Sequence, residues 1–217
     1  MSIAENILSI QSTLPAQVTL VAVSKTKPIA ALMEAYDAGQ RIFGENKIQE
    51  MAEKCEAMPK DIQWHMIGHV QTNKVKFMAP FVNLIHGVDS LKLMQEINKQ
   101  AVKADRVIDC LLQIHIAEEE TKFGLDEQEL TSLLSSSEFK EMRNIRIVGL
   151  MGMATFTDNK DQIKKEFTHL KSIFDSFAVH NSQFTVLSMG MSGDYQLAIE
   201  CGSTMVRIGS SIFGGRN

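Results

Sequence analysis

Eight short apolar runs recur along the chain, and amphipathic segments separate most of them. The runs occupy residues 18–25, 41–46, 61–68, 84–89, 109–116, 145–153, 184–189 and 204–209. Helical patterns cover residues 2–13, 28–38, 47–58, 91–104, 126–136, 160–178 and 194–201. Because apolar residues fill nearly every position of most runs, the runs are interpreted as buried strands. Strand–helix alternation in turn predicts parallel strands joined by right-handed crossovers.

Eight parallel strands permit either a closed (β/α)8 barrel or an open doubly wound sheet. The strand count favours the barrel, although such barrels typically contain ~250 residues and this chain has 217. The link from Gln71 to Val82 carries the weakest helical pattern, because it is short and Pro80 interrupts it. No interdomain linker or low-complexity tract is present, so residues 1–217 are expected to form one TIM-barrel domain.

Polar residues mark the starts of several helices. Asp89-Ser90 and Asp158-Asn159 each precede a predicted helix and supply an N-cap. Ser192 is predicted to cap the helix that begins near Asp194, since a serine hydroxyl accepts a hydrogen bond from the first free N–H groups. Asp194 itself is expected to face the helix end or solvent.

Composition excludes several classes of protein. The chain has 22 basic and 26 acidic residues in no long single-sign block, which argues against a nucleic-acid binder. Its start lacks the basic and apolar regions of a signal peptide, and no apolar stretch approaches the ~20 residues of a membrane span. Three widely spaced cysteines form no C-x-x-C pair and are typical of reduced thiols, so a cytoplasmic protein is predicted.

Lys25 ends the first apolar run. Lysine is rarely buried without a partner, and in parallel α/β proteins chemistry takes place at the carboxyl ends of the strands. Considered by itself, Lys25 has a simpler interpretation: its aliphatic stem covers apolar surface while its amine stays in water. If the barrel closes, however, the ends of the other seven strands lie on the same rim, so their residues decide between the two interpretations.

The last two strand ends form a candidate phosphate site, because barrels often hold phosphate at the loops after strands seven and eight. Gly190 and Gly193 follow the seventh strand, and Gly209 and Gly214 follow the eighth. Glycines let the backbone approach an anion closely, and helix N-termini offer free N–H groups. Methionines interrupted by glycine, at residues 151–153 and 189–191, suggest a pocket wall beside Ser188.

A lysine and a phosphate corner on one rim predict a phosphorylated carbonyl compound bound as a Schiff base, because a desolvated lysine amine attacks aldehydes. Pyridoxal 5′-phosphate (PLP) supplies both an aldehyde and a phosphate. The phosphosugar substrate of an aldolase does so too. Arg207, at the end of the eighth strand, is placed either to pair with phosphate or to donate to a pyridine nitrogen.

Ordered segments along almost the whole chain resemble the pyridoxal-phosphate homeostasis proteins, single-domain relatives of the alanine racemase N-terminal barrel. These segments are Leu20-Val-Ala-Val-Ser-Lys25, Phe43-Gly-Glu-Asn46 with Gln49-Glu50, Trp64-His-Met-Ile-Gly68 with Gln71-Thr-Asn-Lys74, His86-Gly-Val-Asp-Ser90, Lys122-Phe-Gly124, Gly149-Leu-Met-Gly-Met153, Leu187-Ser-Met-Gly-Met-Ser192, Gly202-Ser-Thr-Met-Val-Arg-Ile-Gly209 and Ile212-Phe-Gly214. The resemblance implies a fold type III PLP barrel.

The resemblance also implies roles for individual residues. Lys25 would carry the cofactor as an internal aldimine, and Arg207 would face the pyridine nitrogen. The remaining predicted cofactor-binding residues are Ser192, Gly209 and Ser210 at the phosphate, Asn46 and His65 at the ring, and Met151 and Ser188. The chain departs from the commonest family pattern at Lys47, Ser210-Ser211 and Gly215. Serine for threonine keeps a hydroxyl for phosphate, whereas Lys47 is placed to alter the mouth of the pocket.

Arginine opposite the ring nitrogen bears on catalysis. PLP is the strongest electron sink when that nitrogen is protonated, and arginine offers only donors, so Arg207 would weaken the sink. The chain ends at Asn217, eight residues after Gly209, and no second domain is expected to supply another acid–base group. The sequence therefore predicts a monomeric, non-catalytic PLP carrier, with apo PLP enzymes as candidate recipients. The alternatives are a minor amino-acid racemase and a Schiff-base aldolase.

His65 and His69 are four residues apart, which is the histidine spacing of a zincin-type zinc site. That motif needs a helix with glutamate after the first histidine, whereas this segment reads as a strand and Met66 follows His65. No metal site is therefore predicted. His86 and His115 are interpreted as core or rim histidines.

Overall fold

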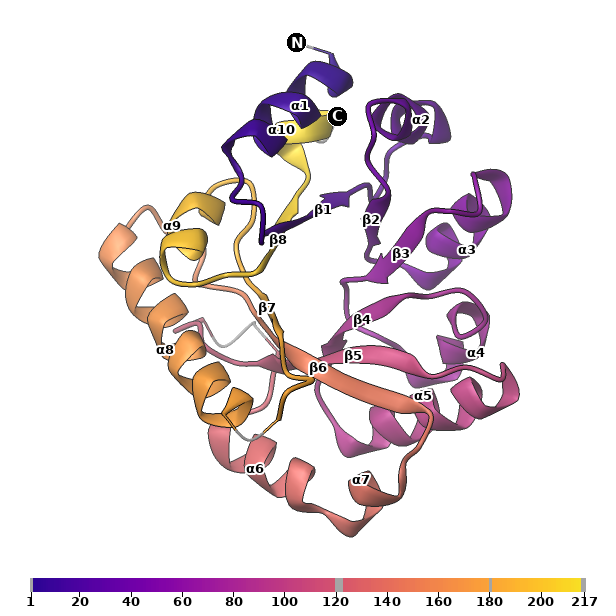
Figure 1. Ribbon diagram of the computed structural model, residues 1–217, viewed down its shortest axis with the longest axis vertical. Coiled ribbons are helices and arrows are strands. Elements are labelled where there is room, and N and C mark those ends of the chain that lie inside the picture. Colours follow the sequence, from indigo (N-terminus) through magenta and orange to yellow (C-terminus); the bar gives the residue numbers. More distant parts are fainter. Residues whose placement is uncertain (1, 120–122, 180, 216–217) are drawn as a thin grey trace.

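The strands form a closed parallel barrel in the computed structural model, which describes residues 2–119, 123–179 and 181–215. They follow one another around the barrel in chain order (Figure 1) as β1 (Thr19–Val23), β2 (Ile42–Glu45), β3 (Gln63–Met66), β4 (Leu84–Val88), β5 (Ile108–Ile114), β6 (Ile145–Gly152), β7 (Val186–Ser188) and β8 (Met205–Ile208). Residues 19–22 of β1 pair in parallel with β8, which closes the barrel. The predicted (β/α)8 barrel is therefore confirmed, and the alternative of an open doubly wound sheet is excluded.

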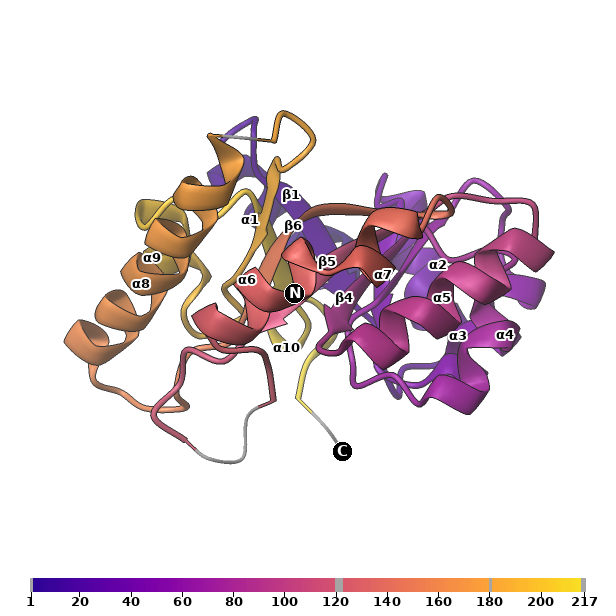
Figure 2. The same cartoon turned by 90° about the horizontal axis from the view of Figure 1, so that it is seen from below.

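Helices surround the barrel (Figure 1). They are α1 (Ile3–Thr13), α2 (Ile29–Asp37), α3 (Ile48–Ala57), the 3-10 turn η1 (Thr72–Lys74), α4 (Val75–Met78), α5 (Leu91–Lys103), α6 (Glu127–Ser135), α7 (Ser137–Glu141), α8 (Lys160–Ala178), α9 (Tyr195–Glu200) and α10 (Ser210–Phe213). Figure 2 shows α8 and α9 on one side of the barrel and α3, α4 and α5 on the other. All seven predicted helices are present. The short helices α7 and α10 were not predicted.

Apolar side chains fill two separate layers. In α8, Ile163, Phe167, Leu170 and Phe174 recur every three or four residues and are buried against the outside of the barrel, as the amphipathic pattern predicts. A second cluster lies inside the barrel and consists of Val21, Leu84, Leu111, Val148, Met151 and Met205. Eight strands leave an interior just wide enough for side chains, so this cluster closes the barrel below its mouth.

Two of the predicted helix caps are confirmed. Ser90 Oγ accepts a hydrogen bond from Leu93 N, and Asn159 Oδ1 accepts from the N–H groups of Asp161 and Gln162. The prediction for Ser192 is wrong. The N-cap of α9 is Asp194, and the Ser192 hydroxyl instead accepts from Gly209 N, 3.2 Å away on the neighbouring loop. Ser192 lies three residues before Tyr195, the first residue of α9, and its hydroxyl points toward the loop after β8 and not toward the start of α9.

Candidate functional site

A cavity of about 550 Å³ opens at the carboxyl ends of the strands. Six of the nine predicted cofactor-binding residues line it, namely Lys25, Asn46, Ser192, Arg207, Gly209 and Ser210. They follow β1, β2 and β7 or lie at the end of β8, so barrel closure brings together residues up to 185 positions apart, from Lys25 to Ser210. The loop from β6 to α8 lines another part of the cavity with Thr155, Phe156, Thr157 and Asp158.

Lys25 lies two residues beyond β1, half-buried at the wall of this cavity. The chain turns there, because Lys27 N donates to Ser24 O at 3.1 Å. Thr26 takes a positive φ of 62° in this turn, which is rare for a β-branched residue. The strand therefore ends at a defined turn, which places Lys25 in the cavity wall at the carboxyl ends of the strands.

Arg207 is buried where β8 reaches the floor of the cavity. Its Nη1 donates to Ser188 O at 2.9 Å and to Ser188 Oγ at 2.7 Å, and its Nη2 donates to Gly152 O at 3.1 Å. A guanidinium has five N–H groups, so Nε and one Nη2 hydrogen carry no hydrogen bond to the described residues. Burial lowers the pKa of Arg207 to about 10, which leaves it charged at neutral pH.

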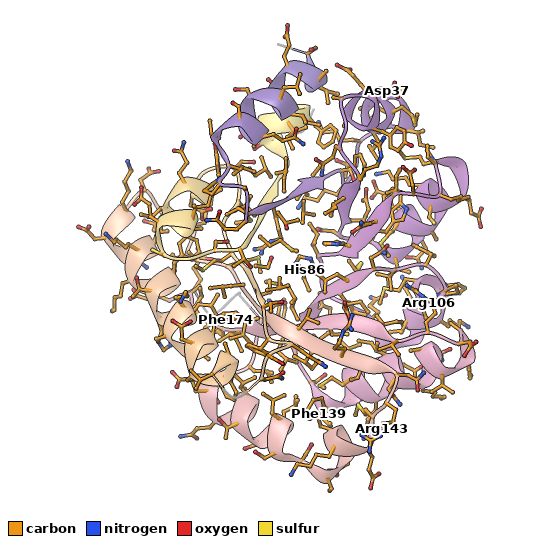
Figure 3. The ribbon with its side chains drawn as sticks, viewed as in Figure 1. Asp37, His86, Arg106, Phe139, Arg143 and Phe174 are labelled. Atoms are coloured by element: carbon orange, nitrogen blue, oxygen red, sulfur yellow. The ribbon has the colours of Figure 1, made fainter. Side chains whose placement is uncertain are left out.

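A hydrogen-bonded chain runs from Arg207 through the interior of the barrel. Ser188 Oγ lies 3.1 Å from His86 Nδ1, and His86 Nε2 lies 3.1 Å from His65 Nδ1. Figure 3 shows His86 in the middle of the ring of strands. Because Arg207 can only donate to Ser188 Oγ, the serine hydrogen is directed to His86 Nδ1. The donor–acceptor balance then places the hydrogen of each histidine on Nε2.

Both histidines are neutral in the folded protein. Burial lowers the pKa of His65 to about 3, and burial together with the nearby His65 and Arg207 lowers the pKa of His86 well below its usual value. The prediction that His86 is a core histidine with its hydrogen bonds satisfied is confirmed.

We expect the free energy of unfolding to fall as the pH drops below 6.5, the ordinary pKa of histidine. In that range the unfolded chain binds a proton at His65 and at His86, whereas the folded chain does not. Each histidine contributes a slope of about 1.4 kcal/mol per pH unit once the unfolded side chain is protonated. Urea unfolding at a series of pH values between neutral and mildly acidic measures this slope. The variant His86→Asn should show a shallower slope, and an unchanged slope would contradict the assignment.

The corner predicted to bind phosphate lies between the loops after β7 and β8. Ser192 Oγ accepts from Gly209 N at 3.2 Å and is 3.5 Å from Ser211 N, so two backbone N–H groups converge on one oxygen. Gly190 has φ of 96°, and a Cβ there would lie 2.6 Å from Ala198 Cβ, so this turn requires glycine. At Gly193 a Cβ would meet nothing within 4 Å. The corner thus combines a turn that is fixed at Gly190 with open space beside Gly193.

Asp194 was predicted to face the helix end or solvent, but its side chain makes no cap bond to α9. It lines the cavity, and its Oδ1 accepts from Met191 N at 2.6 Å, which closes the loop after β7. Burial raises its pKa, while the Met191 N–H and the charge of Arg207 act in the opposite direction. Asp194 therefore stabilises the loop after β7, because one oxygen of its carboxylate accepts a hydrogen bond from the backbone of Met191.

Three predicted site residues lie below the cavity and do not line it. Met151 packs in the interior cluster, and Ser188 and His65 belong to the chain that ends at Arg207. Lys47 is exposed beside a smaller hollow next to the mouth. Lys122 lies outside the described residues, and within those residues no group of side chains could hold a metal ion.

Sequence reasoning missed a charged cluster behind Lys25. Glu45, Lys54 and Glu50 converge there from β2 and α3. Glu45 and Glu50 stand in motifs quoted for the resemblance, but Lys54 gives no signal, because it resembles any lysine on the polar face of a helix. Lys27 was also missed: its Nζ donates to the carbonyls of Phe213, Gly214 and Gly215 and holds the C-terminal segment beside the cavity.

Comparisons with a family model, with curated relatives and with solved structures all match this chain to one group of proteins over most of its length. The family model described as "Alanine racemase, N-terminal domain" matches residues 1–217. The pyridoxal phosphate homeostasis protein of Aquifex aeolicus is 39% identical over 199 residues, which cover 91% of this chain and 86% of the relative. The structure of PipY from Synechococcus elongatus with PLP bound has a TM-score of 0.88 and 34% identity, over 98% of this chain and 100% of PipY. Alanine racemase from E. faecalis, at 15% identity and a TM-score of 0.77, shares the fold, and the match covers 58% of the racemase chain.

Proposed function

Since the chain belongs to the pyridoxal phosphate homeostasis proteins of the alanine racemase N-terminal domain family, we propose that it binds PLP covalently through Lys25. We further propose that it serves intracellular PLP homeostasis and amino-acid balance without strong catalytic turnover. The observation that carries the proposal is the convergence of Lys25, Arg207 and the Ser192–Gly209 corner on one cavity. A primary amine, a donor for a ring nitrogen and an anion corner are the three features that this cofactor needs.

The residues present fit the cofactor. The N–H groups of Gly209 and Ser211 already point at one oxygen, that of the Ser192 hydroxyl, which marks where a phosphate oxygen could accept hydrogen bonds. Arg207 keeps two donors that no described protein group accepts, and a pyridine nitrogen is an acceptor. The cavity of about 550 Å³ is also within the usual size for small-ligand sites.

Each residue then has a distinct task. Lys25 would hold the aldehyde end and the loops after β7 and β8 would hold the phosphate end, in a cavity that Asn46 also lines. Arg207 would donate to the ring nitrogen and keep a proton off it, while Ser188, His86 and His65 keep the guanidinium in place from below. When bound, the cofactor supplies an aldehyde and an electron sink, and a charged arginine at its nitrogen keeps that sink weak.

The cavity offers little for proton transfer to a substrate. Among its described lining residues there is no histidine, tyrosine or cysteine. Apart from Lys25 and Arg207, the titratable side chains among those residues are Lys27, Asp194 and Asp158. Lys27 donates to three carbonyls, Asp194 accepts from Met191 N, and Asp158 is exposed. A racemase needs a second group that accepts or donates a proton opposite the lysine, so these surroundings favour a protein that holds the cofactor over one that turns over amino acids.

The visible absorption spectrum tests the proposal. Titrating PLP into the cofactor-free protein should produce a band distinct from that of free PLP, which saturates at one equivalent and survives desalting. A spectrum that remains that of free PLP at all ratios would contradict covalent binding.

We also propose where the protein acts, in what oligomeric state, and which proteins receive its cofactor. We take residues 1–217 as one PLP-binding domain that acts as a cytoplasmic monomer and passes the cofactor to apo PLP enzymes. No helix in the described part of the chain is long and apolar enough to cross a membrane. Light scattering gives the mass in solution, and mixing the loaded protein with an apo PLP enzyme in a dialysis-separated cell distinguishes direct transfer from release and rebinding.

A further inference from the structure

Three charged residues lie directly behind Lys25, two of them buried and the third, Glu50, partly buried. Glu45, at the end of β2, is 0% exposed, and Lys54, on α3, is 5% exposed. Lys54 Nζ lies 2.7 Å from Glu45 Oε1 and 2.7 Å from Glu50 Oε1. These side chains form a cluster of one positive and two negative charges that does not line the cavity.

The cluster contacts the turn at three points, on both sides of Lys25. The Ser24 hydroxyl donates to Glu45 Oε1 at 2.6 Å, and Lys54 Nζ donates to Ser24 O at 2.9 Å. On the other side, Thr26 N donates to Glu50 Oε1 at 2.6 Å. Each side chain of the cluster therefore forms one hydrogen bond with Ser24 or Thr26, the two neighbours of Lys25.

The turn needs such support. Thr26 has φ of 62°, and a β-branched side chain disfavours this left-handed conformation. Strained backbone of this kind persists only where the surroundings determine it, and it gathers at functional sites. The bond from Thr26 N to Glu50 and the bond from Lys54 to Ser24 O fix the two peptide groups that flank Lys25.

Stability alone does not explain the cluster. A buried ion pair is often no more stabilising than apolar side chains of similar size, because both charges lose their water. Here Glu45 Oε2 is buried with no hydrogen-bond partner among the described residues, and burial raises the pKa of Glu45 despite the hydrogen bonds from Lys54 and Ser24. A leucine–methionine pair would fill the same space without that loss of hydration.

We propose that Glu45, Lys54 and Glu50 are positioning residues, which hold the Ser24–Thr26 turn in the conformation that directs the Lys25 amine into the cavity. This inference rests on the proposed function, in which Lys25 is the residue that binds PLP. The cluster does not line the cavity and acts through the backbone of the turn.

Variants that remove the cluster without leaving a buried charge provide the test. Glu45→Leu/Lys54→Met replaces the innermost pair, and Glu50→Leu removes the acceptor for Thr26 N. Glu50→Gln keeps an acceptor at the same place and serves as the conservative rescue. Lys171→Met is the matched control, because Lys171 pairs with Asp175 at the same i,i+4 spacing on α8, far from the turn in sequence.

Three quantities are measured on each protein: the rate at which PLP forms its absorption band, the hydrogen exchange of the Thr26 amide without cofactor, and the urea midpoint. We expect Glu45→Leu/Lys54→Met and Glu50→Leu to slow band formation about 10- to 100-fold, as small misplacements of reacting groups do. The Thr26 amide should exchange faster in Glu50→Leu, with a urea midpoint near that of the wild type. Glu50→Gln and Lys171→Met should bind as the wild type does.

The outcomes separate the two proposals. Wild-type rates in both cluster variants, with or without a change in the urea midpoint, would overturn the positioning role while leaving Lys25 as the binding residue. Slow binding by Glu50→Gln to the same extent as by Glu50→Leu would overturn it as well, since the acceptor is retained. If the wild-type protein itself gives no band, the proposed function fails, and the inference fails with it.

Discussion

The variant Lys25→Ala is expected to lose covalent PLP completely, with a dissociation constant raised by about 100-fold or more, equivalent to ~2.7 kcal/mol. The Ser192–Gly209 corner and Arg207 remain in this variant and still offer hydrogen bonds. The amine that remains among the described lining residues, that of Lys27, is bonded to three carbonyls. Equilibrium dialysis against PLP, followed by absorption spectroscopy of the retained fraction, measures the loss.

Lys47→Ala is the control for that experiment. Lys47 is an exposed lysine at the same end of the barrel, but it does not line the main cavity. Its removal should leave the band and the affinity unchanged. Retention of the band in Lys25→Ala would show that another amine binds the aldehyde and would contradict the assignment of Lys25.

The variant Gly149→Ala is expected to destabilise the fold by about 3 kcal/mol or more, at the upper end of the range for overpacking. A Cβ at this position would lie 1.7 Å from Val186 O. Gly149 pairs with Val186 where β6 meets β7, next to an irregularity in the pairing of β5 with β6. The clash is with backbone, so relief requires β7 to move, and β7 carries Ser188, which holds Arg207.

Urea unfolding of Gly149→Ala and of the control Gly193→Ala measures this effect. A Cβ at Gly193 would meet nothing within 4 Å, so its substitution should change the free energy of unfolding by less than about 1 kcal/mol. Equal stability of the two variants would contradict the close approach of β6 and β7.

The fold was predictable because one physical rule determines it. Parallel strands buried on both faces must be apolar at nearly every position, and such runs stand out between amphipathic helices. The unpredicted helices α7 and α10 have five and four residues, too few for a periodic pattern to be recognised. Barrel closure then brought Lys25, Arg207 and Gly209 together around one cavity, as strand order predicts.

The site was predictable only where its residues end a strand. Position in the sequence does not show how deep a side chain lies. Met151, Ser188 and His65 were predicted to bind the cofactor, but they lie below the cavity and do not line it. Ser192 was expected at a helix start, but the loop turns its hydroxyl toward Gly209. The Glu45–Lys54–Glu50 cluster depends on a contact between β2, α3 and a turn, which no single segment of sequence encodes.

Identification of the residue that carries the cofactor tests the central claim most directly. The loaded protein is reduced with borohydride, which makes the link between amine and cofactor stable, and its peptides are analysed by mass spectrometry. We predict one added pyridoxyl group for each chain, located on Lys25. An unmodified protein, or a modification located on a lysine other than Lys25, would contradict the claim.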